Sequence, residues 1–227
     1  MKITAEFVTS AAGPSDFPPG GLPELALVGR SNVGKSSLIN ALVRQSVART
    51  SGTPGKTRLA NIYRVARGSA PAIYMIDLPG FGFARGGSVG FEDLATAVLG
   101  PDVAALLLVD ARHPGLDSDL KAWTWLRQAV ARPAVVATKI DKLARGERIR
   151  AMRQLESVFA DSVLPVSAVT GEGLDELWKL IDSLANRPRP NSSSPSNRPP
   201  SRSRLQSKAT APPRPRKPTR VLHLPKR

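Results

Sequence analysis

This chain of 227 residues is 41% hydrophobic, which is enough to bury the core of one ordinary α/β domain. It has no cysteine, which excludes a disulfide framework and a thiolate metal site, and its longest purely apolar run, residues 103–109, is too short to cross a membrane. Its net charge of +15 belongs mostly to residues 186–227, which hold 12 of the 33 Lys and Arg residues and none of the 18 Asp and Glu residues.

Apolar stretches of strand length alternate with stretches of helical spacing along residues 1–185. We predict strands at residues 2–8, 25–28, 58–65, 72–76, 103–109, 134–137 and 162–166. We predict helices at residues 36–44, 116–130, 145–159 and 174–185, and a hairpin loop at residues 68–71. This alternation predicts a three-layer α/β domain with a mostly parallel sheet.

The phosphate-binding loop motif G-x-x-x-x-G-K-[ST], or P-loop, follows the second predicted strand. Its residues are Gly29, Arg30, Ser31, Asn32, Val33, Gly34, Lys35 and Ser36. The glycines let backbone N–H groups curl around the β-phosphate at the N-terminus of a helix. We expect Lys35 to reach the β- and γ-phosphates and the Ser36 hydroxyl to bind Mg²⁺, so the motif predicts a nucleotide site.

Several threonines lie between the first predicted helix and the strand at residues 58–65. A threonine there can complete the Mg²⁺ shell only when the γ-phosphate is present, which is the order–disorder switch of GTPases. Thr57 is the candidate ligand, and Thr53 and Thr50 are its rivals. The predicted nucleotide-binding residues of this stretch are Gly55, Lys56, Thr57, Arg58 and Leu59.

A D-x-x-G motif follows the strand at residues 72–76. It comprises Asp77, Leu78, Pro79 and Gly80. We expect Asp77 to hold Mg²⁺ through a water molecule and the Gly80 N–H to sense the γ-phosphate.

Two later motifs predict which base is bound. They are Thr138, Lys139, Ile140 and Asp141 after one strand, and Val166, Ser167 and Ala168 at the end of another. The Asp141 carboxylate can accept hydrogen bonds from N1–H and the 2-amino group of guanine, both of which adenine lacks. The Lys139 stem can cover the base plane, and a backbone N–H near Ser167 can meet the guanine O6. Because ligands bind at the carboxyl ends of strands in such sheets, the four ordered motifs predict GTP rather than ATP.

Five segments of the chain resemble the EngB (YsxC) family of ribosome-biogenesis GTPases, in the TrmE-Era-EngA-EngB-like superfamily. They are residues 23–26, 29–40, 53–57, 77–84 and 109–114. The aromatic-Gly-aromatic-Ala run at 81–84 and the D-x-R-H segment at 110–113 distinguish this family from its GTPase relatives. The resemblance covers residues 3–185 and implies a P-loop GTPase fold.

Membership of that family implies a bacterial cytoplasmic GTPase that assists assembly of the large ribosomal subunit and is needed for normal cell division and septation. The resemblance favours Thr57 over its rivals, supports Ser36 and Thr57 as Mg²⁺ ligands, and accounts for Thr138 in place of the commoner Asn. We expect a monomer that binds GTP or GDP and the large ribosomal subunit with its RNA, without a membrane partner.

The expected catalytic groups are Lys35, Thr57 and Gly80. In Ras-like enzymes a glutamine directly after D-x-x-G orients the attacking water, but Phe81 stands here and a phenyl ring cannot do so, which predicts slow intrinsic hydrolysis. Asn32 either holds K⁺ near the phosphates, as in related GTPases without the glutamine, or only accommodates a tight turn. Arg30, Arg58 and Arg85 are interpreted as solvated charges, and His113 as a structural loop residue.

Two segments depart from the family. Residues 86–101 look short and lack the expected helix bearing tryptophan and tyrosine. Residues 186–227, rich in Pro, Ser and Arg, are predicted to be a disordered tail that either contacts RNA or is a passive extension. Two functions remain open: a GTPase switch in ribosome assembly, and a basic RNA-binding adaptor for which the nucleotide is a structural ligand. A third, a membrane-surface signalling GTPase tethered by the tail, is disfavoured because the tail has no apolar face and no cysteine for lipidation.

Overall fold

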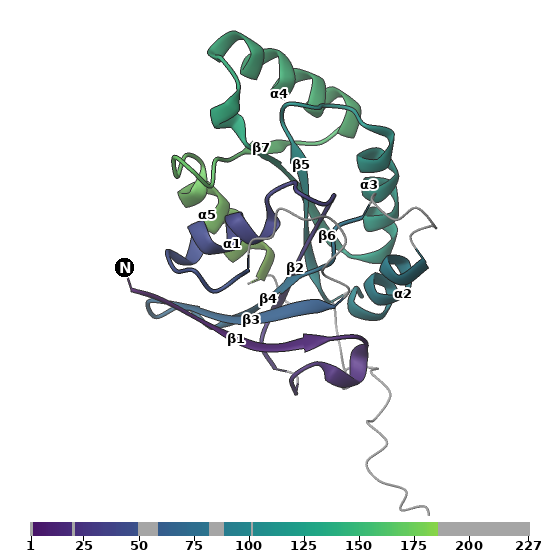
Figure 1. Ribbon diagram of the computed structural model, residues 1–227, viewed down its shortest axis with the longest axis vertical. Helices are drawn as coiled ribbons and strands as arrows, with labels where there is room; N and C mark the ends of the chain where they lie inside the picture. The colour runs from purple at the N-terminus through teal and green to yellow at the C-terminus, as the bar shows by residue number, and fades with distance from the viewer. Residues whose placement is uncertain (1, 20, 50–58, 82–88, 101, 186–227) are drawn as a thin grey trace, which may run out of the picture. The chain divides into compact units, whose positions relative to one another are not determined.

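The computed structural model describes residues 2–19, 21–49, 59–81, 89–100 and 102–185, and its centre is a seven-stranded sheet (Figure 1). The order of the strands across the sheet is β1-β3-β4-β2-β5-β6-β7. The strands are β1 (Ile3–Ala11), β2 (Glu24–Gly29), β3 (Ala60–Arg67), β4 (Ile73–Asp77), β5 (Ala104–Asp110), β6 (Arg132–Thr138) and β7 (Val163–Pro165). Strands β4, β2, β5, β6 and β7 pair in parallel, whereas β1 and β3 add an antiparallel edge.

Helices cover both faces of this sheet. Those within the described residues are α1 (Lys35–Val43), α2 (Val89–Val98), α3 (Asp117–Ala129), α4 (Arg145–Phe159) and α5 (Leu174–Ala185), with the short 3₁₀ turns η1 (Pro14–Asp16) and η2 (Ile140–Lys142). Buried side chains of α1 and α5 pack into one hydrophobic cluster, and those of α2, α3 and α4 pack into another. The predicted three-layer α/β domain with a mostly parallel sheet is confirmed.

The central strand β5 shows why the chain forms two clusters. All seven of its residues are buried, because helices cover both of its faces. Successive side chains point to opposite faces, so Leu106 and Leu108 join the α1 and α5 cluster while Leu107 and Val109 join the other. A continuous apolar run in the sequence therefore supplies both cores at once.

The predicted elements agree with the observed ones to within a few residues, and the α4 and α5 predictions agree at both ends. Helix α2 was not predicted, although Leu94, Ala95 and Val98 of this helix are buried at helical spacing. It contains neither tryptophan nor tyrosine, as the sequence indicated. On α3, Trp123 is buried while Trp125 is half-buried against the same cluster.

The described part of the chain ends at Ala185, and the predicted tail at residues 186–227 lies outside it. The domain boundary there stays a prediction. Within the described ranges, no helix is both long and apolar enough to span a membrane.

Replacing a core leucine tests the packing of the sheet. Leu106 has no exposed surface, so we expect Leu106→Ala to lower the free energy of unfolding by about 2–5 kcal/mol through lost burial and a residual cavity. Leu116→Ala is the matched control, because Leu116 is 37% exposed. Urea denaturation of both variants measures the difference, and equal losses would contradict the assigned core.

Candidate functional site

The P-loop joins the end of β2 to the start of α1, and its first glycine lies where no side chain would fit. A Cβ on Gly29 would lie 2.7 Å from the carbonyl oxygen of Leu108 on β5. The loop then adopts left-handed backbone conformations at Asn32 (φ 63°) and Gly34 (φ 108°). Such turns direct successive N–H groups into a concave anion site, which lies here at the N-terminus of a helix.

Lys35, Ser36 and Asp77 converge beside this loop. The Lys35 ammonium donates to the carbonyl oxygens of Gly29 at 3.2 Å and Arg30 at 3.5 Å, and the Ser36 hydroxyl donates to Asp77 Oδ2 at 2.8 Å. Burial lowers the pKa of Lys35, against the opposing effect of Asp77. Burial likewise raises the pKa of Asp77, against the opposing effects of Lys35 and Ser36. The neighbouring charges and hydrogen bonds therefore do not fully offset the cost of burying the charged forms of Lys35 and Asp77.

The other carboxylate oxygen of Asp77, Oδ1, is buried and has no hydrogen-bond donor among the described residues. A buried carboxylate oxygen without a donor is costly, and a metal-bound water is a suitable donor. Together with the Ser36 hydroxyl, this oxygen fits the predicted magnesium site.

Asp141 and Ser167 form the opposite end of the site. The Ser167 hydroxyl donates to Asp141 Oδ1 at 2.7 Å and accepts the N–H groups of Val169 and Thr170. The bond from Ser167 is the main reason why the pKa of Asp141 is lowered. Asp141 is thus a carboxylate at neutral pH, as hydrogen bonding to guanine requires.

The same loop refines which backbone N–H is available to a base. The Ser167 N–H donates to the Glu172 carbonyl at 2.9 Å, which leaves the N–H of Ala168 as the better candidate for the guanine O6. Gly173 closes the loop with φ 77°, and a Cβ there would lie 2.1 Å from the Pro165 carbonyl oxygen. The loop therefore depends on a glycine that the sequence motif did not include.

Thr138 ties the phosphate end to the base end. Its hydroxyl oxygen lies 2.7 Å from the carbonyl oxygen of Val33 and 3.1 Å from that of Val109, so its proton is shared between the P-loop and β5. The hydroxyl is buried, and a side chain without a donor would remove this link between the P-loop and β5. A threonine thus serves at a position where an asparagine is commoner.

The Lys139 ammonium has two partners, the P-loop and Asp110. Asp110 is not part of the sequence motifs for nucleotide binding. Lys139 Nζ donates to the Asn32 carbonyl of the P-loop and to Asp110 Oδ2, the latter at 3.0 Å. Asp110 also accepts two bonds from the Arg112 guanidinium, at 2.9 and 2.7 Å. Although burial acts to raise the pKa of Asp110, these hydrogen bonds outweigh it and hold the pKa well below its usual range.

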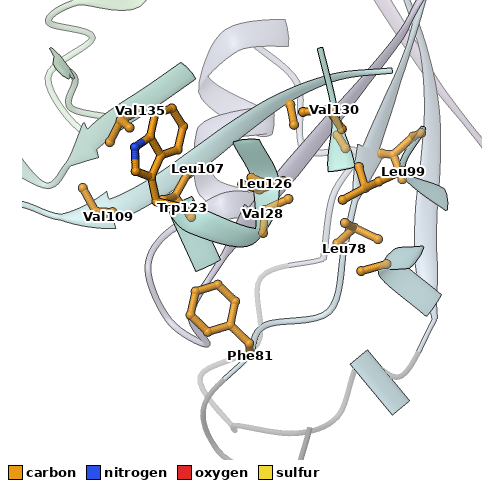
Figure 2. Packing of buried hydrophobic residues seen from close by; sticks show 14 of the residues in the cluster. Val28, Leu78, Phe81, Leu99, Leu107, Val109, Trp123, Leu126, Val130 and Val135 are labelled. Carbon is orange, nitrogen blue, oxygen red and sulfur yellow. The ribbon is translucent and has the colours of Figure 1, made fainter. Parts of the chain in front are cut away.

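Gly80, the last residue of the D-x-x-G motif, and Phe81 lie against the P-loop. The Ser31 N–H donates to the Phe81 carbonyl at 3.2 Å, and a Cβ on Gly80 would lie 2.6 Å from the Ser31 backbone. The Phe81 side chain belongs to the cluster that contains Val28 and Trp123 (Figure 2). Its ring occupies core space, so this position supplies no polar group to a reacting water.

Known proteins match this chain over most of its length. The family described as 50S ribosome-binding GTPase matches residues 24–139. The probable GTP-binding protein EngB of Anaeromyxobacter sp. (strain Fw109-5) is 42% identical over 198 residues, covering 81% of this chain and 92% of the relative. A relative of the same name in Pelotomaculum thermopropionicum is 40% identical over 193 residues, covering 80% and 96%. This chain belongs to the EngB family of GTPases.

Solved structures confirm the P-loop GTPase fold of this EngB-family chain. A crystal structure of a probable GTP-binding protein EngB aligns with a TM-score of 0.53 at 23% identity, covering 71% of this chain and 98% of the other. A variant of Aquifex aeolicus Era, bound to GDP and aluminium fluoride, aligns with a TM-score of 0.64 at 25% identity, covering 78% and 61%. The family assignment makes this chain an enzyme that binds GTP and hydrolyses it.

Arg30 of this EngB-family chain is not the solvated charge that the sequence indicates. Its Nε donates to Asp119 Oδ1 on α3 at 3.0 Å. The Asp119 side chain is only 2% exposed, and burial raises its pKa against the opposing effect of Arg30. The sequence does not show this pair because the two residues meet only when α3 packs beside the P-loop.

Part of the predicted EngB site lies outside the described residues. This part comprises Thr50, Thr53, Gly55, Lys56, Thr57, Arg58 and Arg85. The neighbouring Leu59 is described and is 39% exposed. The carbonyl of Asn32 is engaged by Lys139, and the K⁺ role of this residue stays a prediction.

The acid sensitivity of Asp110 gives a test of its ion pairs. A carboxylate whose pKa is lower in the folded state contributes stability at neutral pH, and this contribution is lost as the pH falls below about 4. We expect Asp110→Asn to lower the free energy of unfolding at pH 7 by roughly 1.5–3 kcal/mol and to approach wild-type stability as the solution is acidified.

Chemical denaturation between neutral and acidic pH measures this convergence. Asp102→Asn is the matched control, because Asp102 is exposed and its carboxylate makes no ion pair with any described residue. A constant gap between wild-type and Asp110→Asn at every pH would contradict the assignment.

Proposed function

We propose that this chain is a slowly hydrolysing GTP switch that assists assembly of the large ribosomal subunit in the bacterial cytoplasm, and that normal cell division depends on it. The observation that carries this proposal is the pairing of Ser36 with Asp77, whose second oxygen is buried without a donor. A site kept only as a structural pocket has no need of this arrangement. The family description as a 50S ribosome-binding GTPase supports the choice of partner.

Mg²⁺ would be held by Ser36 directly and by Asp77 through water, with Thr57 as the proposed further ligand. When bound, the ion neutralises charge on the β- and γ-phosphates. The buried Lys35 ammonium exchanges its P-loop carbonyls for phosphate oxygens, which relieves its incomplete compensation. Asp141 and the Ala168 N–H select guanine.

The surroundings of Phe81 support slow turnover. Its ring is packed in the core, and its carbonyl accepts the Ser31 N–H at the edge of the P-loop. A γ-phosphate sensed by the Gly80 N–H would act on this same segment, so the segment is suited to report the nucleotide state. The group that accelerates hydrolysis would come from a partner or an ion.

The tail favours an RNA-containing partner. Its 12 Lys and Arg residues are accompanied by no acidic residue, as a polycation for phosphate backbones requires. The same feature supports the alternative function, an RNA-binding adaptor with a structural nucleotide. The two functions differ in whether the nucleotide controls binding, and a monomer suffices for either.

Exchange of the guanine-binding carboxylate tests the base assignment. The Asp141→Asn side chain offers a donor to the 2-oxo group of xanthine, whereas the carboxylate accepts from the 2-amino group of guanine. We expect GTP affinity to fall by at least roughly 100-fold and XTP affinity to rise, because a mismatched buried polar group is rejected strongly. Equilibrium binding of GTP, XTP and ATP measures this, with Asp161→Asn as the control. Wild-type affinity for ATP equal to that for GTP would contradict the assignment.

Co-sedimentation tests the proposed switch. We expect the full chain to sediment with large ribosomal subunits when it holds a non-hydrolysable GTP analogue and to be released with GDP. Ser36→Ala, which removes the hydroxyl ligand of Mg²⁺, should bind the large ribosomal subunit weakly whether the GTP analogue or GDP is present. Binding that is equal with GTP analogue, with GDP and without nucleotide would support the adaptor function instead.

A further inference from the structure

A groove of about 450 Å³ is lined by residues of α4 and by Pro165 at the end of β7. Among the described residues, strand β7 forms the edge of the sheet beside β6, and α4 packs beside it (Figure 1). None of the residues assigned above to the nucleotide site lines the groove. It is therefore a separate surface of the same domain.

Helical geometry arranges the groove residues in two rows. Arg145, Ile149 and Arg153 are four residues apart and share one row, while Arg148 and Met152 belong to the adjacent row. The two outer arginines of the first row are roughly 12 Å apart along the helix axis. The row therefore presents a cation, an apolar side chain and a second cation in sequence.

The charges of the first row are available to a ligand. Arg145 and Arg153 are exposed, and neither forms an ion pair with any residue in the described ranges. Arg148 is different, because it pairs with Glu172 in the loop that follows Ser167. The acidic side chain that lines the groove is Glu156, so the lining stays net positive.

The apolar part of the groove is open to solvent. The Ile149 side chain lies between the two arginines and is 47% exposed, whereas Met152 is partly buried against the core. Guanidinium groups bind phosphate through paired N–H donors and also stack on planar bases. Exposed apolar surface between two such groups suits a base that is not stacked in a duplex.

We propose that this groove binds single-stranded RNA, with phosphates on Arg145 and Arg153 and a base over Ile149. The inference rests on the proposed function for its source of RNA, the ribosomal particle. The chain's own tail is a poor occupant, because its charge has the same sign as the groove. Arg148 supports the loop of the guanine site through Glu172, so it is left unchanged in the test.

The test compares two charge-matched variants of the full chain. Arg145→Ser/Arg153→Ser removes the groove cations, and Lys121→Ser/Arg127→Ser removes two exposed cations from α3. Both variants keep residues 186–227, so any contribution of the tail to RNA binding is the same in each. Binding of a short fluorescent oligouridine is measured by anisotropy between about 50 and 200 mM salt. GTP affinity and circular dichroism report whether each variant is folded.

The groove variant should flatten the plot of log affinity against log salt by about 1.4 units, because each phosphate of a single strand that is no longer neutralised accounts for about 0.7. The α3 variant should keep the wild-type slope. Ile149→Asp, which retains both arginines, should also weaken oligouridine binding, whereas Val158→Asp on the same helix should not. Equal slopes for the groove variant and wild-type, or equal flattening by both double variants, would overturn the proposal.

Large-subunit sedimentation separates the remaining outcomes. If the groove variant no longer bound the ribosomal particle but kept its oligouridine slope, the groove would bind an acidic protein segment and the RNA proposal would be overturned. Nucleotide-independent sedimentation of the wild-type chain would count against the proposed switch alone. In that case a difference in slope between the groove variant and the α3 variant would still support the RNA site.

Discussion

The parallel register of β2, β5 and β6 is the constraint on which the site depends. Asp110 pairs with Thr138, so β5 and β6 end at the same level, and Gly29 pairs with Leu108, so β2 ends two residues earlier at the same edge of the sheet. The P-loop, the Asp110 segment and the Thr138 segment therefore begin as neighbours. The Thr138 hydroxyl then connects the P-loop carbonyl of Val33 to β5, which fixes the distance between the two ends of the site.

Two groups of charged side chains lie around these strand ends, and they differ in how far hydrogen bonds and opposite charges offset the cost of their burial. Asp110 receives bonds from both Arg112 and Lys139, which stabilise its ionised form without any ligand. Lys35 and Asp77 are buried with fewer partners, and burial acts against the charged form of each. The first group holds the base end in place, and the second is stabilised further when phosphates and a metal ion supply the missing partners.

Hydrophobic packing replaces polar chemistry after the D-x-x-G motif. Phe81 is anchored in the same cluster as α2 and α3, while its backbone remains bonded to Ser31 of the P-loop. A side chain in the core holds the segment in place but offers nothing to a water molecule. This position therefore contributes packing rather than a polar group to the site.

The amino-acid sequence by itself determined the strand and helix pattern, the P-loop and the guanine motifs, because each depends on local spacing or on residue types that few other chemistries need. It did not determine helix α2, whose short apolar pattern follows a glycine-rich stretch. Only the tertiary structure decided the partners of Arg30, Lys139 and Thr138, since each partner is remote in the sequence. Such contacts arise when the sheet aligns the strand ends, and no local pattern encodes them.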